Sequence, residues 1–206
     1  MEVTIIGETR DYRNLFIDKG HSIIPMNRLY DTDLVVFTGG EDVTPAWYGE
    51  EPGPKTFYNP IRDKKERDIF VNCEMMSIPM VGICRGGQFL NVMNGGKMLQ
   101  HVQGHTKSHM MQDIYDQWAL VSSTHHQMMI RHPSGLQVAW AMEGCSKQAF
   151  VGNQYIEVEE DIDTEVVYYA STNSLCFQPH PEFTGAEYAD MKSMFFMYLK
   201  SFMEFE

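Results

Sequence analysis

Short apolar runs alternate with amphipathic segments over the first half of the chain. The runs are rich in β-branched residues and have the length of buried parallel strands. Between them, apolar residues recur at the spacing of a helical face, and glycine or proline marks the helix ends. The pattern predicts strands over 2–7, 33–40 and 80–84, and helices over 11–20, 60–78 and 86–96.

From about residue 118 the periodicity shortens to that of strands joined by short turns. The predicted elements are strands over 118–123, 136–142, 154–160, 165–171 and 174–180, and a closing helix over 185–203. The fold class is therefore α/β, with a mainly parallel central sheet, helices on both faces and a C-terminal antiparallel β extension. No repeat or linker interrupts the sequence, so we expect a single domain over 1–206.

Composition and charge narrow the classes of function. The 206 residues are 43% hydrophobic, which is enough for one substantial core. A formal net charge of -12 offers no basic stripe for a phosphate backbone, so we expect no nucleic-acid partner. The N-terminal apolar run is short and begins with an acidic residue. We therefore expect a cytoplasmic protein without membrane insertion.

Cys84 follows an apolar strand directly, and Gly86 and Gly87 permit a tight turn into the next helix. This is the arrangement of a nucleophile elbow, in which the thiol lies at a helix N-terminus that stabilises the thiolate. Arg85 beside the sulfur favours the same interpretation. The competing interpretation is a core cysteine inside a strand. The other cysteines lack the glycine turn and are interpreted as packing residues: Cys73, Cys145 and Cys176.

A nucleophilic cysteine needs a base, and the base needs an orienting group. His180 follows an apolar strand, and Glu182 lies two residues further on. In an extended segment both side chains point the same way, so Glu182 can fix which imidazole nitrogen faces the sulfur. A His-Pro-Glu turn at the surface is the alternative, and spacing alone leaves it open.

Residues 82–88 (GICRGGQ) together with 180–182 (HPE) resemble the class I glutamine amidotransferase superfamily. The resemblance extends to its γ-glutamyl hydrolase branch, which includes γ-glutamyl-GABA hydrolases. The stretches that carry it are GGEDVTPAWYGE (39–50), RDKKE (62–66), GICRGGQFLNVMNGGKMLQ (82–100) and STHHQ (123–127). They follow the family's order, and they imply its flavodoxin-like sandwich.

The resemblance assigns roles to the matching positions. It makes Cys84 the nucleophile, His180 the general base and acid, and Glu182 the residue that orients the histidine. It also implies that backbone N–H groups of Gly40 and Arg85 form an oxyanion hole. Such donors stabilise the tetrahedral oxyanion that forms when sulfur attacks an amide carbonyl.

The resemblance further implies that Gln88 and one of the tandem histidines, His125 or His126, hold a small γ-glutamyl substrate, with His125 preferred. It implies no cofactor and no metal ion. The chain departs from the usual pattern of the branch at three places outside the triad: Pro179, His101 and the longer segment 145–170. These departures bear on the substrate and leave the triad intact.

Three functions of different classes stay open at this point. The first is a free-standing hydrolase that cleaves a γ-glutamyl amide through a thioester on Cys84. The second is a glutaminase subunit that passes ammonia to a partner synthetase. The third is a non-catalytic binding protein, which the intact triad disfavours. A homodimer is compatible with each of them.

Two further groups of residues have competing interpretations. His101, His105 and His109 recur every four residues, but Gly104 interrupts the helix that would align them as metal ligands. We interpret them as solvated loop histidines. The acidic run 157–165 is interpreted as a solvated hairpin end.

Arg62, Asp63 and Glu66 lie on the predicted helix over 60–78. Arg62 and Glu66 have the i, i+4 spacing of a weak surface ion pair. The resemblance instead puts this group near the rim of the substrate pocket. The residues alone leave both interpretations open.

Overall fold

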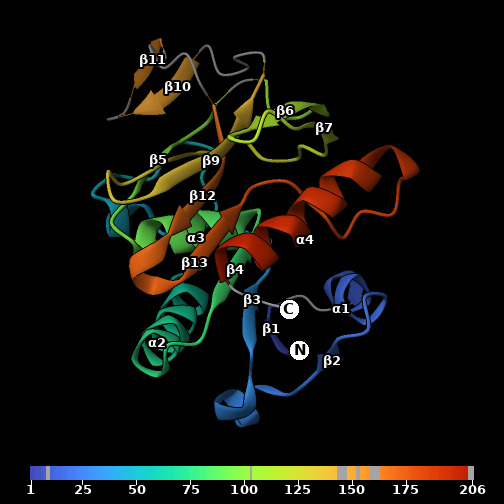
Figure 1. The fold of residues 1–206 in the computed structure, drawn as a ribbon. Helices are drawn as coiled ribbons and strands as arrows, with labels where there is room; N and C mark the ends of the chain where they lie inside the picture. The colour runs from blue at the N-terminus through green and yellow to red at the C-terminus, as the bar shows by residue number, and fades with distance from the viewer. Residues whose placement is uncertain (8–9, 103, 143–147, 152–153, 158–162, 204–206) are drawn as a thin grey trace.

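The structure is a computed structural model. It describes residues 1–7, 10–102, 104–142, 148–151, 154–157 and 163–203. Most of its apolar runs pair into one sheet, whose nine strands in the described part of the chain follow the order β2-β1-β3-β4-β13-β12-β9-β6-β7 (Figure 1). In chain order these strands are β1 (Glu2–Ile6), β2 (Ser22–Ile23), β3 (Leu34–Phe37), β4 (Met80–Ile83), β6 (His109–Asp113), β7 (Trp118–Val121), β9 (Leu136–Ala141), β12 (Thr164–Tyr169) and β13 (Ser174–Phe177).

The sheet has a parallel half and an antiparallel half. Strands β2, β1, β3, β4 and β13 run parallel to one another. From β13 onward, β12, β9, β6 and β7 pair antiparallel. This confirms the predicted α/β fold with a mainly parallel central sheet and a C-terminal antiparallel β extension.

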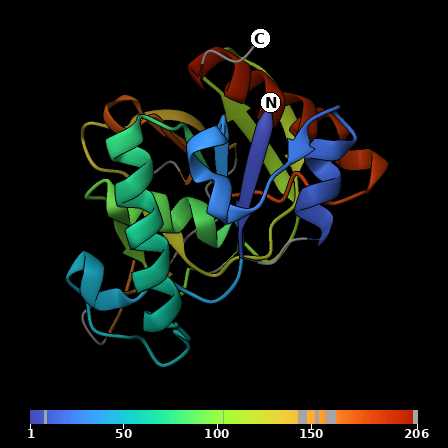
Figure 2. The same cartoon turned by 90° about the horizontal axis from the view of Figure 1, so that it is seen from below.

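Helices cover both faces of the parallel half, and Figure 2 shows α2 on one side of β1, with α1 and α4 on the other. Along β3, Leu34 and Val36 pack in the same apolar cluster as α1 and α4, whereas Val35 and Phe37 pack with α2 and α3. Successive strand side chains point to opposite faces, so a strand buried on both sides must be apolar throughout. The helices are α1 (Arg10–Ile17), α2 (Pro60–Met76), α3 (Arg85–Met93) and α4 (Ala189–Met203).

Several short strands were not predicted from the sequence. One of them is β6, whose sequence HMMQD mixes polar and apolar residues without a clear alternation. Two small antiparallel ribbons join β5 (Lys97–Leu99) to β8 (Met128–Ile130), and β10 (Gln148–Val151) to β11 (Gln154–Glu157). Residues 158–160 of the strand predicted over 154–160 lie outside the described residues. The single-domain organisation stays a prediction.

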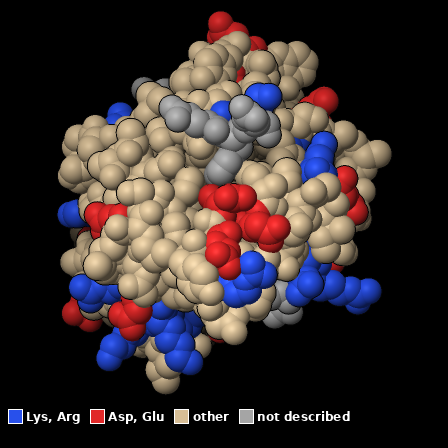
Figure 3. Space-filling view, turned by 60° about the horizontal axis from the view of Figure 1, so that its bottom comes forward, with Lys and Arg blue, Asp and Glu red and all other residues tan. Residues whose placement is uncertain are grey.

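The surface carries charges of both signs. On the face drawn in Figure 3, described Lys and Arg side chains are interspersed with Asp and Glu and form no continuous basic field. Among the described helices, none combines the length and the apolar character that crossing a bilayer requires.

The start of α3 packs so closely on the sheet that it requires glycine. A Cβ atom on Gly86 would overlap the backbone carbonyl of Phe37 in β3, and one on Gly82 would overlap the backbone of Gly86. Replacing glycine by alanine in a helix normally stabilises it by about 1 kcal/mol. At Gly86 the overlap with rigid backbone makes the same replacement destabilising.

We therefore expect Gly86→Ala to lower the free energy of unfolding by about 1–3 kcal/mol, because the helix must shift away from β3. Urea denaturation followed by circular dichroism measures the change. A variant as stable as the wild type, or more stable, would contradict the close packing of α3 on the sheet.

Candidate active site

Cys84 lies at the turn between β4 and α3, with φ 53° and ψ −116°. This positive φ is a costly conformation for a residue that carries a side chain, and such strain is common at functional sites. Backbone hydrogen bonds hold the turn: Cys84 N donates to Phe177 O over 2.8 Å, and Gln88 N donates to Cys84 O over 3.1 Å. The predicted strained elbow is confirmed, and the core-strand interpretation of Cys84 is wrong.

His180 follows β13, the parallel neighbour of β4, with Phe177 in register with Ile83. Because carboxyl ends of parallel strands lie at one edge of a sheet, this pairing brings His180 beside Cys84. Both lie against Gly39, since a Cβ on that glycine would be 3.5 Å from His180 Cε1 and 3.7 Å from Cys84 Cβ. The Glu182 carboxylate Oε1 lies 2.6 Å from His180 Nδ1.

The histidine is held in its charged form. Burial alone lowers the pKa of His180, but hydrogen bonds and charge from Cys84 and Glu182 outweigh it and raise the pKa to about 10. Thr124 Oγ1 lies 3.0 Å from Nε2, and Phe183 stacks on the ring with centroids 4.7 Å apart. His180 therefore carries a proton at neutral pH and is fixed in orientation at both ring nitrogens.

A buried network of ion pairs holds the turn that carries Cys84 against α2. The Arg85 guanidinium is 2% exposed and binds the carboxylates of Asp63 and Glu66 on α2. Arg62 binds Glu66 over 2.7 Å and donates to the carbonyl of Gly39 over 2.9 Å. Of the two interpretations of this α2 group, the surface ion pair is wrong, because the carboxylates are enclosed between α2 and α3. The guanidinium of Arg85 is thus bound by carboxylates of α2.

Gly40 and Arg85 line the same pocket as Cys84. Gly40 has φ +142°, a backbone conformation that glycine adopts most readily. The neighbouring Gly39 N–H is already bonded to the Tyr12 hydroxyl over 3.1 Å. Arg85 is the first residue of α3, where backbone N–H groups lack an intrahelical acceptor. Their role as an oxyanion hole stays a prediction that this arrangement permits.

The pocket has a volume of about 230 Å³, and the predicted substrate residues Gln88, His125 and His126 line it. Gln88 Nε2 donates to Gln178 Oε1 over 3.1 Å. Burial lowers the pKa of His125 to about 4, so this ring is neutral near pH 7. His126 Nε2 lies 3.1 Å from Asp42 Oδ1. The structure thus brings every predicted site residue to one sheet edge.

Some supporting residues were not found from the sequence. The Tyr12 hydroxyl lies beside the catalytic candidates, and burial followed by the charge of Glu182 raises its pKa. Ser122 Oγ accepts a hydrogen bond from His180 N over 2.9 Å. Thr124 belongs to the STHHQ stretch, which gave a signal for it. Tyr12 sits on a helix of ordinary amphipathic pattern, which gave none.

Two interpretations of the histidines and acidic residues are wrong. His105 and Glu165 are both 0% exposed, and His109 begins β6. The acidic run therefore ends inside β12 and not in solvent, because Glu165 turns toward the histidines. Residues 158–162 of that run, and Cys145, lie outside the described residues. The packing interpretation is confirmed for the remaining cysteines, which are buried: Cys73 and Cys176.

Residues 20–158 match the family described as Peptidase C26, and this range is more than half of the chain. The chain belongs to the Peptidase C26 family. Membership supports an amidohydrolase-type function, and the class I glutamine amidotransferase-like resemblance is confirmed. Cys84 falls within the matched range, whereas His180 and Glu182 lie beyond it.

Two relatives of this Peptidase C26 protein come from Lactococcus lactis. "Putative glutamine amidotransferase-like protein YvdE" of subspecies lactis is 38% identical over 101 residues, which are 44% of this chain and 43% of the relative. Its homolog in subspecies cremoris is 31% identical over 159 residues, 62% of this chain and 85% of the relative. The first alignment thus spans less than half of its relative.

Two solved structures share the fold. A glutamine amidotransferase from Thermotoga maritima gives a TM-score of 0.64 at 14% identity, with 97% of this chain and 84% of that chain covered. PurLQS from Thermotoga maritima gives 0.63 at 16% identity, with 88% and 87% covered. At these identities the likeness establishes the fold alone.

Cys84 should be the most reactive of the described thiols. Burial raises the pKa of Cys73 to about 12 and that of Cys176 well above its usual range, whereas Cys84 is partly exposed at a helix N-terminus. We expect iodoacetamide to label Cys84 at least about tenfold faster at neutral pH, as measured by peptide mass spectrometry. The difference should disappear in denaturant, and equal labelling of the folded protein would contradict it.

The proton on His180 gives a second test. Its ring signals should titrate near pH 10, far above those of His21 and His101, whose pKa values burial lowers. Glu182→Gln removes one charge that raises this pKa, so the midpoint should fall. Proton–carbon NMR of the histidine rings measures both midpoints. A wild-type midpoint at or below the ordinary value of 6.5 would show that the three side chains do not form a coupled site.

Proposed function

We propose that this protein hydrolyses a γ-glutamyl amide bond through Cys84, His180 and Glu182, releasing glutamate and an amine or ammonia. The observation that carries the proposal is the position of Cys84 at a strained helix start beside a histidine whose Nδ1 is held by a carboxylate at 2.6 Å. This is the arrangement of an activated nucleophile, a base and an orienting group. Membership in Peptidase C26 supports the same class of reaction.

The first half of the reaction acylates the enzyme. The Cys84 thiolate attacks the γ-carbonyl carbon, a C–S bond forms, and the electron pair of the C=O bond moves to the oxygen. The N–H groups of Gly40 and Arg85 stabilise that oxyanion. Protonated His180 donates its Nε2 proton to the amide nitrogen. The oxyanion then re-forms the C=O bond as the C–N bond breaks, so the amine leaves and a γ-glutamyl thioester remains on Cys84.

The second half releases glutamate. Neutral His180 accepts a proton from water as the water oxygen attacks the thioester carbon. The C–S bond then breaks, the Cys84 thiolate is restored, and His180 again carries the proton. Glu182 keeps Nδ1 protonated throughout, so that Nε2 always faces the reacting atoms.

The pocket supports a small substrate. Its volume of about 230 Å³ lies below the ~300–1,000 Å³ that is typical for drug-sized ligands, and Gln88, His125 and His126 supply polar contacts. A second hollow shares Gly40 and Glu41 with it and is lined by Tyr12, Arg62 and His180. We assign the glutamyl end to the first hollow and the leaving amine to the second, because His180 must reach the leaving nitrogen.

The alternative is a glutaminase subunit that passes ammonia to a partner synthetase. The fold likeness to PurLQS and to a glutamine amidotransferase favours keeping this candidate. It differs from the hydrolase in that ammonia must leave toward a docked partner. A homodimer and a cytoplasmic location stay predictions of the sequence.

The test is turnover of glutamine and of a panel of γ-glutamyl amines by the isolated protein. Cys84→Ala should lower kcat by about 10⁶-fold and Glu182→Gln by about 10⁴-fold, because the first removes the nucleophile and the second disturbs only the histidine. Acid quenching and mass spectrometry should find a glutamyl adduct on Cys84. The exposed histidine variant His132→Gln is the matched control and should retain activity.

The outcome also separates the two candidates. Efficient turnover by the isolated protein supports the hydrolase, and turnover that appears only with an added synthetase supports the subunit. Absence of both turnover and the Cys84 adduct, with every substrate and candidate synthetase present, would overturn the proposal.

A further inference from the structure

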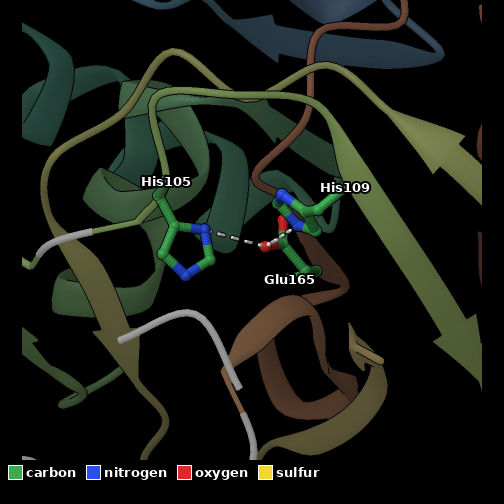
Figure 4. Close-up of side chains that lie close together, drawn as sticks. All are labelled: His105, His109 and Glu165. Carbon is green, nitrogen blue, oxygen red and sulfur yellow. Dashed lines mark hydrogen bonds and ion pairs between the residues drawn. The ribbon is translucent and has the colours of Figure 1, made fainter. Parts of the chain in front are cut away.

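A second cluster of reactive side chains lies next to the pocket, apart from the triad. Imidazole nitrogens of His105 and His109 and a carboxylate oxygen of Glu165 all lie within 4.8 Å of one another. Figure 4 shows Glu165 between the two rings. Its Oε1 is 2.9 Å from His109 Nε2 and 3.5 Å from His105 Nδ1. His105 lies in the loop before β6, His109 is the first residue of β6, and Glu165 lies in β12. Strands β6 and β12 flank β9 in the sheet.

Each histidine already has one ring nitrogen engaged by an acceptor. His105 Nε2 lies 2.8 Å from Asp163 Oδ2, and His109 Nδ1 lies 3.3 Å from the carbonyl of Lys107. These contacts favour a proton on the engaged nitrogen, so the other nitrogen can offer its lone pair to a metal ion once it is deprotonated, which is the second-shell pattern of metal-binding histidines. In both residues the other nitrogen faces Glu165.

Two polar atoms of the cluster are buried and lack a hydrogen-bond partner in the described part of the chain. His105 Nδ1 and Glu165 Oε2 have no hydrogen-bond partner among the described residues, and both residues are 0% exposed. Buried polar atoms of native proteins usually have a partner, so two of them in one cluster indicate a missing ligand.

A third histidine adjoins the cluster. The His125 ring lies 4.5 Å from that of His105 between centroids. Its Nδ1 is engaged by the carbonyl of Gln127 over 2.8 Å, and its Nε2 is buried with no partner in the described part of the chain. His125 thus resembles His105 and His109, because one ring nitrogen is hydrogen-bonded and the other is available to a ligand.

We propose that His105, His109 and Glu165 bind a divalent transition metal ion, for which Zn²⁺ is the best match, and the ring of His125 adjoins this site. Imidazole and carboxylate suit zinc, whereas Mg²⁺ and Ca²⁺ prefer oxygen ligands alone. The ion would replace the proton between His109 Nε2 and Glu165 Oε1, so that binding releases this proton to solvent. The His109 side chain is 11% exposed and marks a route of entry.

The ion would act on structure and not on the reaction. It would link β6 and β12 beside the segment that carries His125, and so stiffen one wall of the substrate pocket. The proposal is independent of the triad. The competing account is a metal-free network in which protonated His109 pairs with Glu165.

The experiment uses chelator-treated protein dialysed against Zn²⁺, with bound metal measured by mass spectrometry. We expect about one tightly held ion per chain and a rise in melting temperature. His109→Gln and Glu165→Gln should each weaken zinc binding by at least about 10- to 100-fold. His132→Gln, an exposed histidine outside the cluster, should bind zinc as the wild type does.

A second measurement does not depend on the variants' folding. Cobalt(II) bound to the wild type should give the intense visible absorption of a tetrahedral site, and added zinc should abolish it. An anomalous difference map at the zinc edge should place the ion between the three side chains. The proposal is overturned if wild-type protein holds no zinc, if both cluster variants bind as His132→Gln does, or if the ion lies elsewhere.

Discussion

The candidate site depends on the buried pairing of Arg85 with Asp63 and Glu66. Arg85 begins α3 directly after the nucleophile candidate, and both carboxylates lie on α2. Asp63 also accepts from the N–H of Thr44 over 2.8 Å, so the same carboxylate holds the loop that follows Gly40. Breaking a buried pair of this kind costs about 3–5 kcal/mol, because the remaining charges are left in a low-dielectric interior. One network therefore fixes the position of the elbow and of the glycine loop opposite it.

The network also determines which groups place positive charge next to the Cys84 sulfur. Two buried carboxylates bind the guanidinium of Arg85 and balance its charge. Positive charge beside the sulfur then comes from His180 and from the N-terminus of α3. In the proposed reaction, His180 thus already carries the proton that it must donate to the leaving group.

The sequence was informative where structure is set locally. The apolar runs predicted the parallel strands, and the glycines after Cys84 predicted the elbow, because both follow from backbone sterics and strand burial. The cluster of His105 and Glu165 was missed since it joins a loop to a strand about 60 residues later, and neither segment alone shows the contact. Tyr12 was missed for the same reason, because its hydroxyl meets Gly39 across the sheet edge.

In the proposed function, the two halves of the sheet separate the reacting residues from the residues that select the substrate. Cys84 and His180 follow neighbouring parallel strands, so their relative position is set by the register of β4 and β13. His125 and His126 instead lie between β7 and β8, and the His125 ring packs against that of His105, whose cluster belongs to the antiparallel half. Substitutions in that half can reshape the pocket without moving the nucleophile. At one departure from the pattern of the branch, His101 Nδ1 lies 3.1 Å from His126 Nδ1, and the His101 ring stacks on that of Tyr155. In the proposed function, a change at this position would alter the substrate and leave the reaction intact.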